Sequence, residues 1–212
     1  MTDRSGEPLG VRAMPEVLAV DGPNEPTLEF LRSVEVTTIA EIGIYRGLTS
    51  VQIAEYLDGR GELHLFDFED LVADVSGRLK AAGHDNVVVH GNSRKLLDSY
   101  NWSLMKLLRE SAEPVFDYVF LDGAHTWAVD GFAFFLIDRL LKVGGYLDLD
   151  DYGWSLGQSP TMNPDVFPMT GELHTDEQIG ERQVALVVDL LVRRDPRYEQ
   201  VVGNRIFRKA SA

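Results

Sequence analysis

The stretch VTTIAEIGIYRGLTSVQIAEYL, residues 36–57, joins a β-rich run to a helical run through a short turn that contains glycine. The run at its start is rich in β-branched and apolar residues, which favours a strand. From Thr49 to Leu57 the apolar residues recur at helical spacing, and Thr49 or Ser50 can cap the helix. The stretch therefore predicts a strand–turn–helix unit, the building block of an α/β fold.

The same alternation continues along the chain. Further strands are expected at 61–70, 86–93, 116–125 and 144–152, and further helices at 71–83, 96–111, 127–141 and 182–194. Such alternation gives right-handed crossovers and a parallel sheet with helices on both faces. Residues 198–209, YEQVVGNRIFRK, predict an antiparallel hairpin that turns at Gly203 and Asn204. We expect a Rossmann-like, doubly wound α/β fold whose mostly parallel seven-stranded sheet ends in this hairpin.

The chain, residues 1–212, has the length of a single domain. Residues 1–34 carry enough Pro and Gly to suggest a loose N-terminal arm with one short helix. Residues 153–178 are rich in Pro, Gly and Ser and are longer than an ordinary connection. We expect this second segment to form a lid loop over a binding site, and Trp154 to border the pocket.

Composition narrows the classes of partner. No apolar run approaches the roughly 20 residues of a membrane helix, and the N-terminus lacks the apolar part of a secretory signal. The absence of cysteine excludes disulfides and thiolate metal sites. A formal net charge of −14 disfavours nucleic acids and anionic membranes. We expect a cytoplasmic protein that binds a small neutral or cationic molecule.

Polar side chains end every predicted parallel strand, and ligands of α/β sheets bind outside these carboxyl ends. In chain order the strand ends carry Glu41, Gly43 and Gly47, then Asp67, then Asn92 and Ser93, then Asp122, and last Asp150 and Asp151. Glu41 would repel a pyrophosphate but would suit an ammonium group. Asp67 has the position that binds ribose hydroxyls in nucleotide-binding sheets. An ammonium and a ribose together describe S-adenosylmethionine better than NAD, although the two glycines alone could serve only the turn.

Three of these acids end two strands that are expected to be neighbours, so Asp122, Asp150 and Asp151 should converge. Two carboxylates about 4 Å apart repel by roughly 4 kcal/mol at an effective dielectric constant near 20. Such a group takes up protons or binds a cation, and oxygen ligands favour Mg²⁺, with Mn²⁺ or Ca²⁺ as alternatives. The two acids after the last parallel strand could instead be a solvated strand end or a helix cap.

His125 follows Asp122 by three residues in the stretch FLDGAHTW, 120–127. A histidine with a pKa near neutrality can remove the proton of a hydroxyl group, which is a poor nucleophile until it is deprotonated. We therefore predict that His125 is the catalytic base. The alternative is that it caps the helix that follows.

Five motifs resemble, in order, those of class I S-adenosylmethionine-dependent methyltransferases: AEIGIYRGLTSVQIAEYL, HLFDFED, HGNS, FDYVFLDGAH and LLKVGGYLDLDDY. The resemblance covers residues 36–152. The first motif and the paired acids are similar to the metal-dependent O-methyltransferase branch. Catechol-type members have Asp-x-x-Lys and Asp-Asn where this chain has Asp-x-x-His and Asp-Asp. In this it is more similar to the macrolide-sugar O-methyltransferases.

The resemblance implies a cofactor site and a reaction. The residues expected to contact S-adenosylmethionine are Glu41, Gly43, Tyr45, Gly47, Asp67, Phe68, Asn92, Ser93 and Asp122. The expected reaction moves a methyl group to a hydroxyl of a small molecule, such as a natural-product sugar. A non-catalytic S-adenosylmethionine-binding protein and a metal-independent N-methyltransferase remain open. The apolar last helix makes a homodimer an option.

Overall fold

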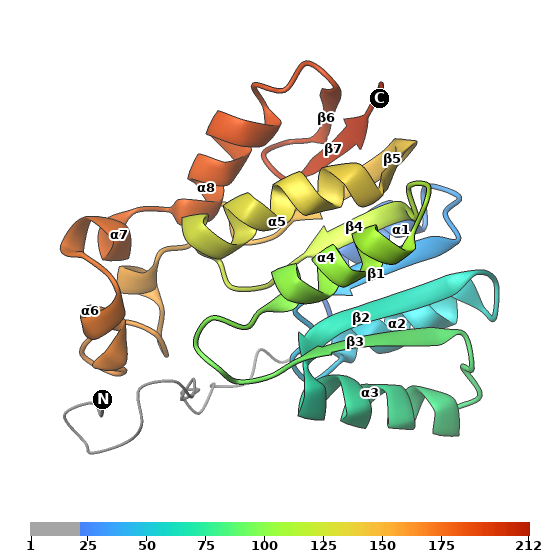
Figure 1. Ribbon diagram of the computed structural model, residues 1–212, viewed down its shortest axis with the longest axis horizontal. Helices are drawn as coiled ribbons and strands as arrows, with labels where there is room; N and C mark the ends of the chain where they lie inside the picture. The colour runs from blue at the N-terminus through green and yellow to red at the C-terminus, as the bar shows by residue number, and fades with distance from the viewer. Residues whose placement is uncertain (1–21) are drawn as a thin grey trace.

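The computed structural model describes residues 22–212, and the first part of the expected N-terminal arm, residues 1–21, lies outside the described residues. A seven-stranded sheet runs through the molecule in the order β3-β2-β1-β4-β5-β7-β6 (Figure 1). Its strands are β1 Thr38–Ile42, β2 Glu62–Phe68, β3 Val87–Asn92, β4 Phe116–Leu121, β5 Leu141–Leu149, β6 Tyr198–Val202 and β7 Ile206–Lys209. The first five strands pair in parallel, while β7 pairs antiparallel with β5 and with β6. The predicted fold class and the C-terminal hairpin are therefore confirmed.

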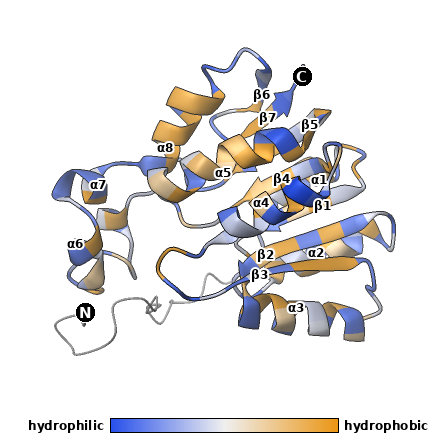
Figure 2. Cartoon of the chain, viewed as in Figure 1, coloured by the Kyte–Doolittle hydropathy of each residue, from blue (hydrophilic) through white to orange (hydrophobic). Residues whose placement is uncertain are grey.

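Helices cover both faces of the sheet. One apolar core joins β strands to α1, α2 and α3, and a second joins them to α4, α5 and α8 (Figure 1). The main helices are α1 Glu25–Leu31, α2 Leu48–Leu57, α3 Glu69–Ala81, α4 Tyr100–Glu110, α5 Trp127–Leu140 and α8 Gln183–Val187. In Figure 2 apolar residues recur along the parallel strands but are interrupted by polar ones, as the alternating colours of β2 show. Among the described residues, no helix is both long and apolar enough to cross a membrane.

Several elements differ in their bounds from the predicted ones; α4, for example, begins at Tyr100 rather than at residue 96. Two further changes concern β5 and the last helix. β5 begins at Leu141, directly after α5, whereas the sequence placed the strand start at Gly144. The last helix is also shorter than expected, because α8 continues as a π-helical turn over Val188–Val192. Neither change moves the carboxyl ends of the parallel strands.

The segment expected to be a lid loop contains short helices. After a 3₁₀ turn at Leu156–Gln158 come α6, Met169–Leu173, and α7, Asp176–Gly180. Thr175 and Gln178 form a capping box at the start of α7, a signal that is readable in the sequence. Leu156 is buried, so the start of the segment is fixed to the domain. Closure of residues 153–178 over a ligand stays a prediction.

Candidate active site

The strand order reverses between β1 and β4, and the candidate site lies at the carboxyl ends of these strands. Backbone hydrogen bonds tie the neighbouring strand ends together. The amide of Asp122 donates to the carbonyl of Ile42 at 2.8 Å, and the amide of Asp150 donates to the carbonyl of Leu121 at 3.1 Å. The polar residues that end β1, β4 and β5 are thereby brought to one edge of the sheet.

Chain packing requires the glycines of the first turn. Gly43 has a φ of +85°, and a Cβ atom there would collide with the carbonyl oxygen of Asp122. Gly47 has a φ of +72°, and a Cβ atom there would collide with the side chain of Val75 on α3. The turn also holds Tyr45 at a φ of 46°, in the left-handed region. These glycines therefore set how closely β1 approaches β4 and α2 approaches α3; cofactor contact by either stays a prediction.

Asp67, at the end of β2, fastens the same turn. Its Oδ2 accepts hydrogen bonds from the amides of Ile44 at 2.8 Å and Tyr45 at 3.1 Å, and its Oδ1 accepts one from Phe68 at 2.7 Å. Burial raises the pKa of Asp67 despite these bonds. Oδ2 already accepts two bonds, but Oδ1 accepts only one and keeps a second lone pair, so Asp67 can still accept from a ribose hydroxyl as predicted.

Glu41 is the most unusual group on β1. Its side chain is buried, and Oε2 has no hydrogen-bond partner within residues 22–212. Burial, with smaller contributions from Asp122 and Asp67, raises the pKa of Glu41 to about 8. A buried carboxylate with a free oxygen is costly unless a cationic group pairs with it. The geometry therefore fits the predicted contact with an ammonium group.

The end of β3 also retains a free acceptor. Asn92 is buried and its Oδ1 has no partner within the described part of the chain, while its Nδ2 donates to the carbonyl of Ser93 at 3.2 Å. Ser93 donates from both its amide and its hydroxyl to Asp98, each at 2.7 Å. Arg94 lies over the ring of Phe68, with its guanidinium carbon 4.2 Å from the ring centroid. The sequence did not single out Asp98 or Arg94: Asp98 fell within the helix expected at 96–111, whereas α4 begins only at Tyr100.

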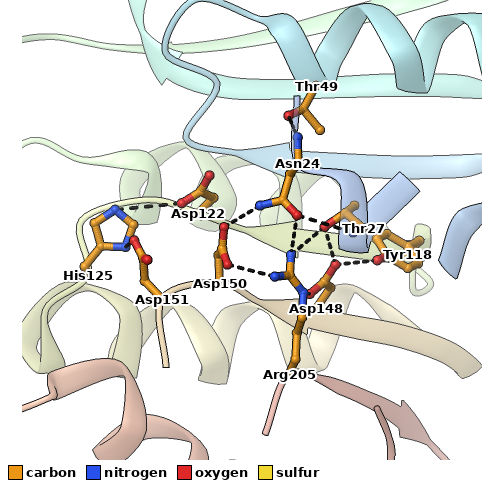
Figure 3. A network of polar contacts seen from close by, with 10 residues as sticks. All are labelled: Asn24, Thr27, Thr49, Tyr118, Asp122, His125, Asp148, Asp150, Asp151 and Arg205. Carbon is orange, nitrogen blue, oxygen red and sulfur yellow. Dashed lines mark hydrogen bonds and ion pairs between the residues drawn. The ribbon is translucent and has the colours of Figure 1, made fainter. Parts of the chain in front are cut away.

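Asp122, His125 and Asp151 form an acidic cluster beside this site (Figure 3). The imidazole Nδ1 of His125 lies 3.3 Å from Oδ2 of Asp151, and its Nε2 lies 3.8 Å from Oδ1 of Asp122. One ligand atom from each residue lies within 4.8 Å of the others. The expected convergence of Asp122 with Asp151 is therefore present, and His125 joins them.

The three groups of this cluster perturb one another strongly. Burial, together with Asp150 and Asp151, raises the pKa of Asp122 to about 7, although His125 opposes the shift. Burial also raises the pKa of Asp151. Burial alone would lower the pKa of His125, but the carboxylates of Asp122 and Asp151 raise it above its ordinary value. Perturbed titratable groups gathered at a strand end are typical of a functional site.

Backbone conformation points to the same cluster. His125 has a φ of 54° and Asp151 a φ of 61°, both in the left-handed region that residues other than glycine rarely adopt. Strained residues of this kind concentrate at functional sites, at a cost on the order of 1–3 kcal/mol each. The ring of Trp154, predicted to border the pocket, lies 5.2 Å from that of His125.

Two buried residues, Tyr100 and Asp130, form hydrogen bonds that support the turn that carries His125. The hydroxyl of Tyr100 donates to Asp130, and Asp130 accepts from the amide of Thr126 at 3.1 Å. The hydroxyl of Tyr100 also accepts from the amide of Ala124 at 3.1 Å. Asp130 is an isolated acid within an apolar helix, which is a sequence signal for a buried polar contact.

Asp150, predicted as the third metal ligand, is engaged elsewhere. Arg205 donates to Oδ1 of Asp150 at 2.8 Å, and the side-chain amide of Asn24 donates to Oδ2 (Figure 3). Asp150 is therefore paired with a guanidinium in this structure, and its role as a metal ligand stays a prediction. Asp148 is fully buried against the same Arg205 rather than facing water.

Comparisons with known proteins identify the family of this chain. The chain matches a family model described as a methyltransferase domain over residues 40–152, more than half of its length. No curated protein matches the sequence.

Solved structures share the fold at low sequence identity. An O-methyltransferase candidate from Klebsiella pneumoniae is 19% identical, with a TM-score of 0.60, covering 92% of this chain and 84% of that one. An O-methyltransferase from Bacillus cereus in complex with S-adenosylhomocysteine is 19% identical, with a TM-score of 0.55 and coverages of 90% and 83%. A methyltransferase from Podospora anserina bound to S-adenosylhomocysteine is 19% identical, with a TM-score of 0.56 and coverages of 85% and 74%. The family match and the sheet order together show that the chain belongs to the methyltransferase-domain family and has the fold of class I S-adenosylmethionine-dependent methyltransferases.

Proposed function

We propose that this protein transfers the methyl group of S-adenosylmethionine to a hydroxyl group of a small molecule. One observation carries the proposal: the buried carboxylate of Glu41, whose Oε2 has no partner within residues 22–212, and the cluster of Asp122, His125 and Asp151 lie at adjoining strand ends. Glu41 suits the cationic methyl donor, and the cluster suits deprotonation of an acceptor hydroxyl. Their proximity is what a methyl transfer between the two requires.

S-adenosylmethionine is the cofactor that best fits the β1–β3 edge. Glu41 would pair with the ammonium of its methionine part, Asp67 would accept from the ribose hydroxyls, and Oδ1 of Asn92 offers a free acceptor near the adenine. Two structural neighbours were solved with S-adenosylhomocysteine, the demethylated product. Tyr45, Phe68 and Ser93 lie in the same turns and complete the proposed cofactor site.

His125 would accept the proton of the acceptor hydroxyl. As the oxygen forms its bond to the methyl carbon, the carbon–sulfur bond breaks with its electron pair on sulfur, and S-adenosylhomocysteine leaves. Asp151 at 3.3 Å from Nδ1 holds the imidazole in one orientation. A positioned base of this kind contributes about 10²–10⁴-fold in rate.

The cluster also fits a divalent cation. The carboxylates of Asp122 and Asp151 would hold it, and the imidazole of His125 is the third ligand atom within reach. Asp122 and Asp151 are partly buried and have raised pKa values, so a hard cation such as Mg²⁺ or Mn²⁺ would stabilise their ionised form. When bound, the cation supplies charge stabilisation for the acceptor oxygen.

Activity with labelled S-adenosylmethionine tests the proposal. A library of sugars and other hydroxyl-bearing natural products would be screened with Mg²⁺ and with EDTA, alongside calorimetric titration of S-adenosylhomocysteine. Metal-dependent O-methylation of a library member is the expected result. Cofactor binding without turnover on any acceptor would favour a non-catalytic binding protein, and EDTA-resistant methylation of amines would favour an N-methyltransferase.

A further inference from the structure

Arg205 joins three segments that are far apart in the chain (Figure 3). It precedes β7, and its Nε donates to Asp148 and its Nη1 to Asp150, both at 2.8 Å. Its Nη2 donates to Oδ1 of Asn24 and to the hydroxyl of Thr27, both at 2.7 Å. The guanidinium thus fastens the end of β5 to the start of α1 from the C-terminal hairpin.

Asp148 gives this contact a rigid base. It is fully buried, and its Oδ2 accepts from the hydroxyls of Thr27 and Tyr118, each at 2.6 Å. The amide of Leu149 also donates to the carbonyl of Arg205 at 3.0 Å. Both the side chain and the backbone of Arg205 therefore hold the last residues of β5.

The two acids after β5 consequently face different partners. Each oxygen of Asp150 already accepts one hydrogen bond, Oδ1 from Arg205 and Oδ2 from Asn24. Asp151 turns the opposite way, through its left-handed backbone, to face His125. The planar guanidinium of Arg205 donates to four residues at once, namely Asp148, Asp150, Asn24 and Thr27. A lysine ammonium lacks this fixed arrangement of donors and cannot replace it.

We propose that Arg205 is a positioning residue that withdraws Asp150 from the acidic cluster and presents Asp151 to His125, so that the cation-binding acids are Asp122 and Asp151. This inference rests on the proposed function for the cation and on geometry alone for the orientation of Asp151. Both adjacent acids would otherwise compete for the same cation.

Mn²⁺ binding, followed by electron paramagnetic resonance on the full chain without any other ligand, tests which acid binds. Asp151→Asn should weaken Mn²⁺ binding at least about tenfold, and Asp150→Asn less than about threefold. Equal weakening in both variants would overturn the proposal. Arg205→Lys should weaken Mn²⁺ binding by about 10-fold, as is typical when a residue that orients a ligand is replaced. Arg208→Lys, an exposed arginine on the same hairpin, is the matched control and should bind normally.

A second readout separates this inference from the proposed function. The imidazole chemical shifts of His125, assigned with His125→Gln and recorded at fixed pH without metal, report the contact with Asp151. Arg205→Lys and Asp151→Asn should move these signals, whereas Arg208→Lys should not. Signals unmoved in Arg205→Lys would overturn the positioning role even if Mn²⁺ binds.

Two further outcomes have a fixed meaning. A wild-type protein that binds no Mn²⁺ but shows the expected pattern of His125 signals would refute the cation in the proposed function and retain the positioning role. Should Arg205→Lys fail to fold, as thermal unfolding would reveal, the comparison of Asp150→Asn with Asp151→Asn decides the matter.

Discussion

The β1–β3 half of the candidate site and its β4–β5 half hold their acids in different ways. In the first, Glu41 is buried and its Oε2 has no partner within residues 22–212, and Asp67 accepts from amides of the turn after β1, 22 and 23 residues earlier in the chain. In the second, Asp150 is held by Asn24 and Arg205, which lie at opposite ends of the described chain. Both halves therefore depend on tertiary contacts, but those of the first join neighbouring strands, while those of the second join the two ends of the described chain.

The largest expected effect tests the chemistry assigned to the β4–β5 half. His125→Gln should lower turnover by about 10²–10⁴-fold while leaving the affinity for S-adenosylhomocysteine nearly unchanged. Kinetics and calorimetry on the same preparation would measure both. His84→Gln, in a turn outside the site, is the control.

The same variant separates the two roles open to His125. If Mn²⁺ affinity is retained while turnover falls, His125 acts as the base. If Mn²⁺ affinity falls with turnover, His125 is a metal ligand. Full activity in His125→Gln would remove it from the mechanism.

A pair of glycine variants tests the contact between the halves. Gly43 and Gly59 both have positive φ values, but only a Cβ at Gly43 would strike backbone, that of Asp122 and Gly123. Gly59→Ala should cost about 1–2 kcal/mol of unfolding free energy from backbone conformation alone. Gly43→Ala should cost clearly more, on the order of 3 kcal/mol or above. Equal costs in denaturant unfolding would show that β1 and β4 approach less closely than described.

In the β1–β3 half, Glu41→Gln should weaken S-adenosylhomocysteine binding by about 10–100-fold, because a charged contact contributes about 1.5–3 kcal/mol. Glu55→Gln, an exposed change on α2, should leave the affinity unchanged in calorimetry. Unaltered binding in Glu41→Gln would mean that the cationic end of the ligand lies elsewhere.

The smallest effect is a pH dependence of stability within β2 and β3. His90 stacks on Phe66 and lies 2.9 Å from Nδ1 of His64 through its Nε2. Burial, with His64 and Lys106, lowers the pKa of His90 from 6.5 to about 4. In the unfolded chain His90 is therefore protonated below about pH 6.5, whereas in the folded chain it is protonated only below about pH 4. The free energy of unfolding should therefore fall as the pH drops through that window.

His90→Phe keeps a ring against Phe66 but cannot titrate, so its loss of stability between pH 6.5 and 4 should be smaller than that of the wild type. Urea unfolding at several pH values would measure the difference. An unchanged pH profile would mean that His90 does not carry this effect.

The sequence predicted the fold well because strand ends and helix periodicity are local signals. The parallel strands, the helices around them and the hairpin at Gly203 and Asn204 all follow from patterns within a dozen or so residues. Convergence of Asp122 with Asp151 also follows, because neighbouring parallel strands end at one edge.

What the sequence could not predict depends on contacts between distant segments. Nothing local marks Arg205 as the partner of Asp148 and Asp150, or Asn24 as the neighbour of β5. Asp150 and Asp151 face different partners only because the hairpin and the start of α1 meet at the end of β5. The short helices α6 and α7 were missed for another reason: each has only five residues in a segment rich in Pro and Gly, and the capping box of α7 is the one local signal that could have revealed it.

The central claim is that the donor methyl group and the acidic cluster share one site. Nuclear magnetic resonance of S-adenosylmethionine carrying a ¹³C-labelled methyl group, bound with Mn²⁺, measures this directly through paramagnetic relaxation. We predict strong broadening of the methyl signal in the wild-type protein, and we expect this broadening to disappear in Asp151→Asn. A sharp methyl signal with both ligands bound to the wild type would contradict it.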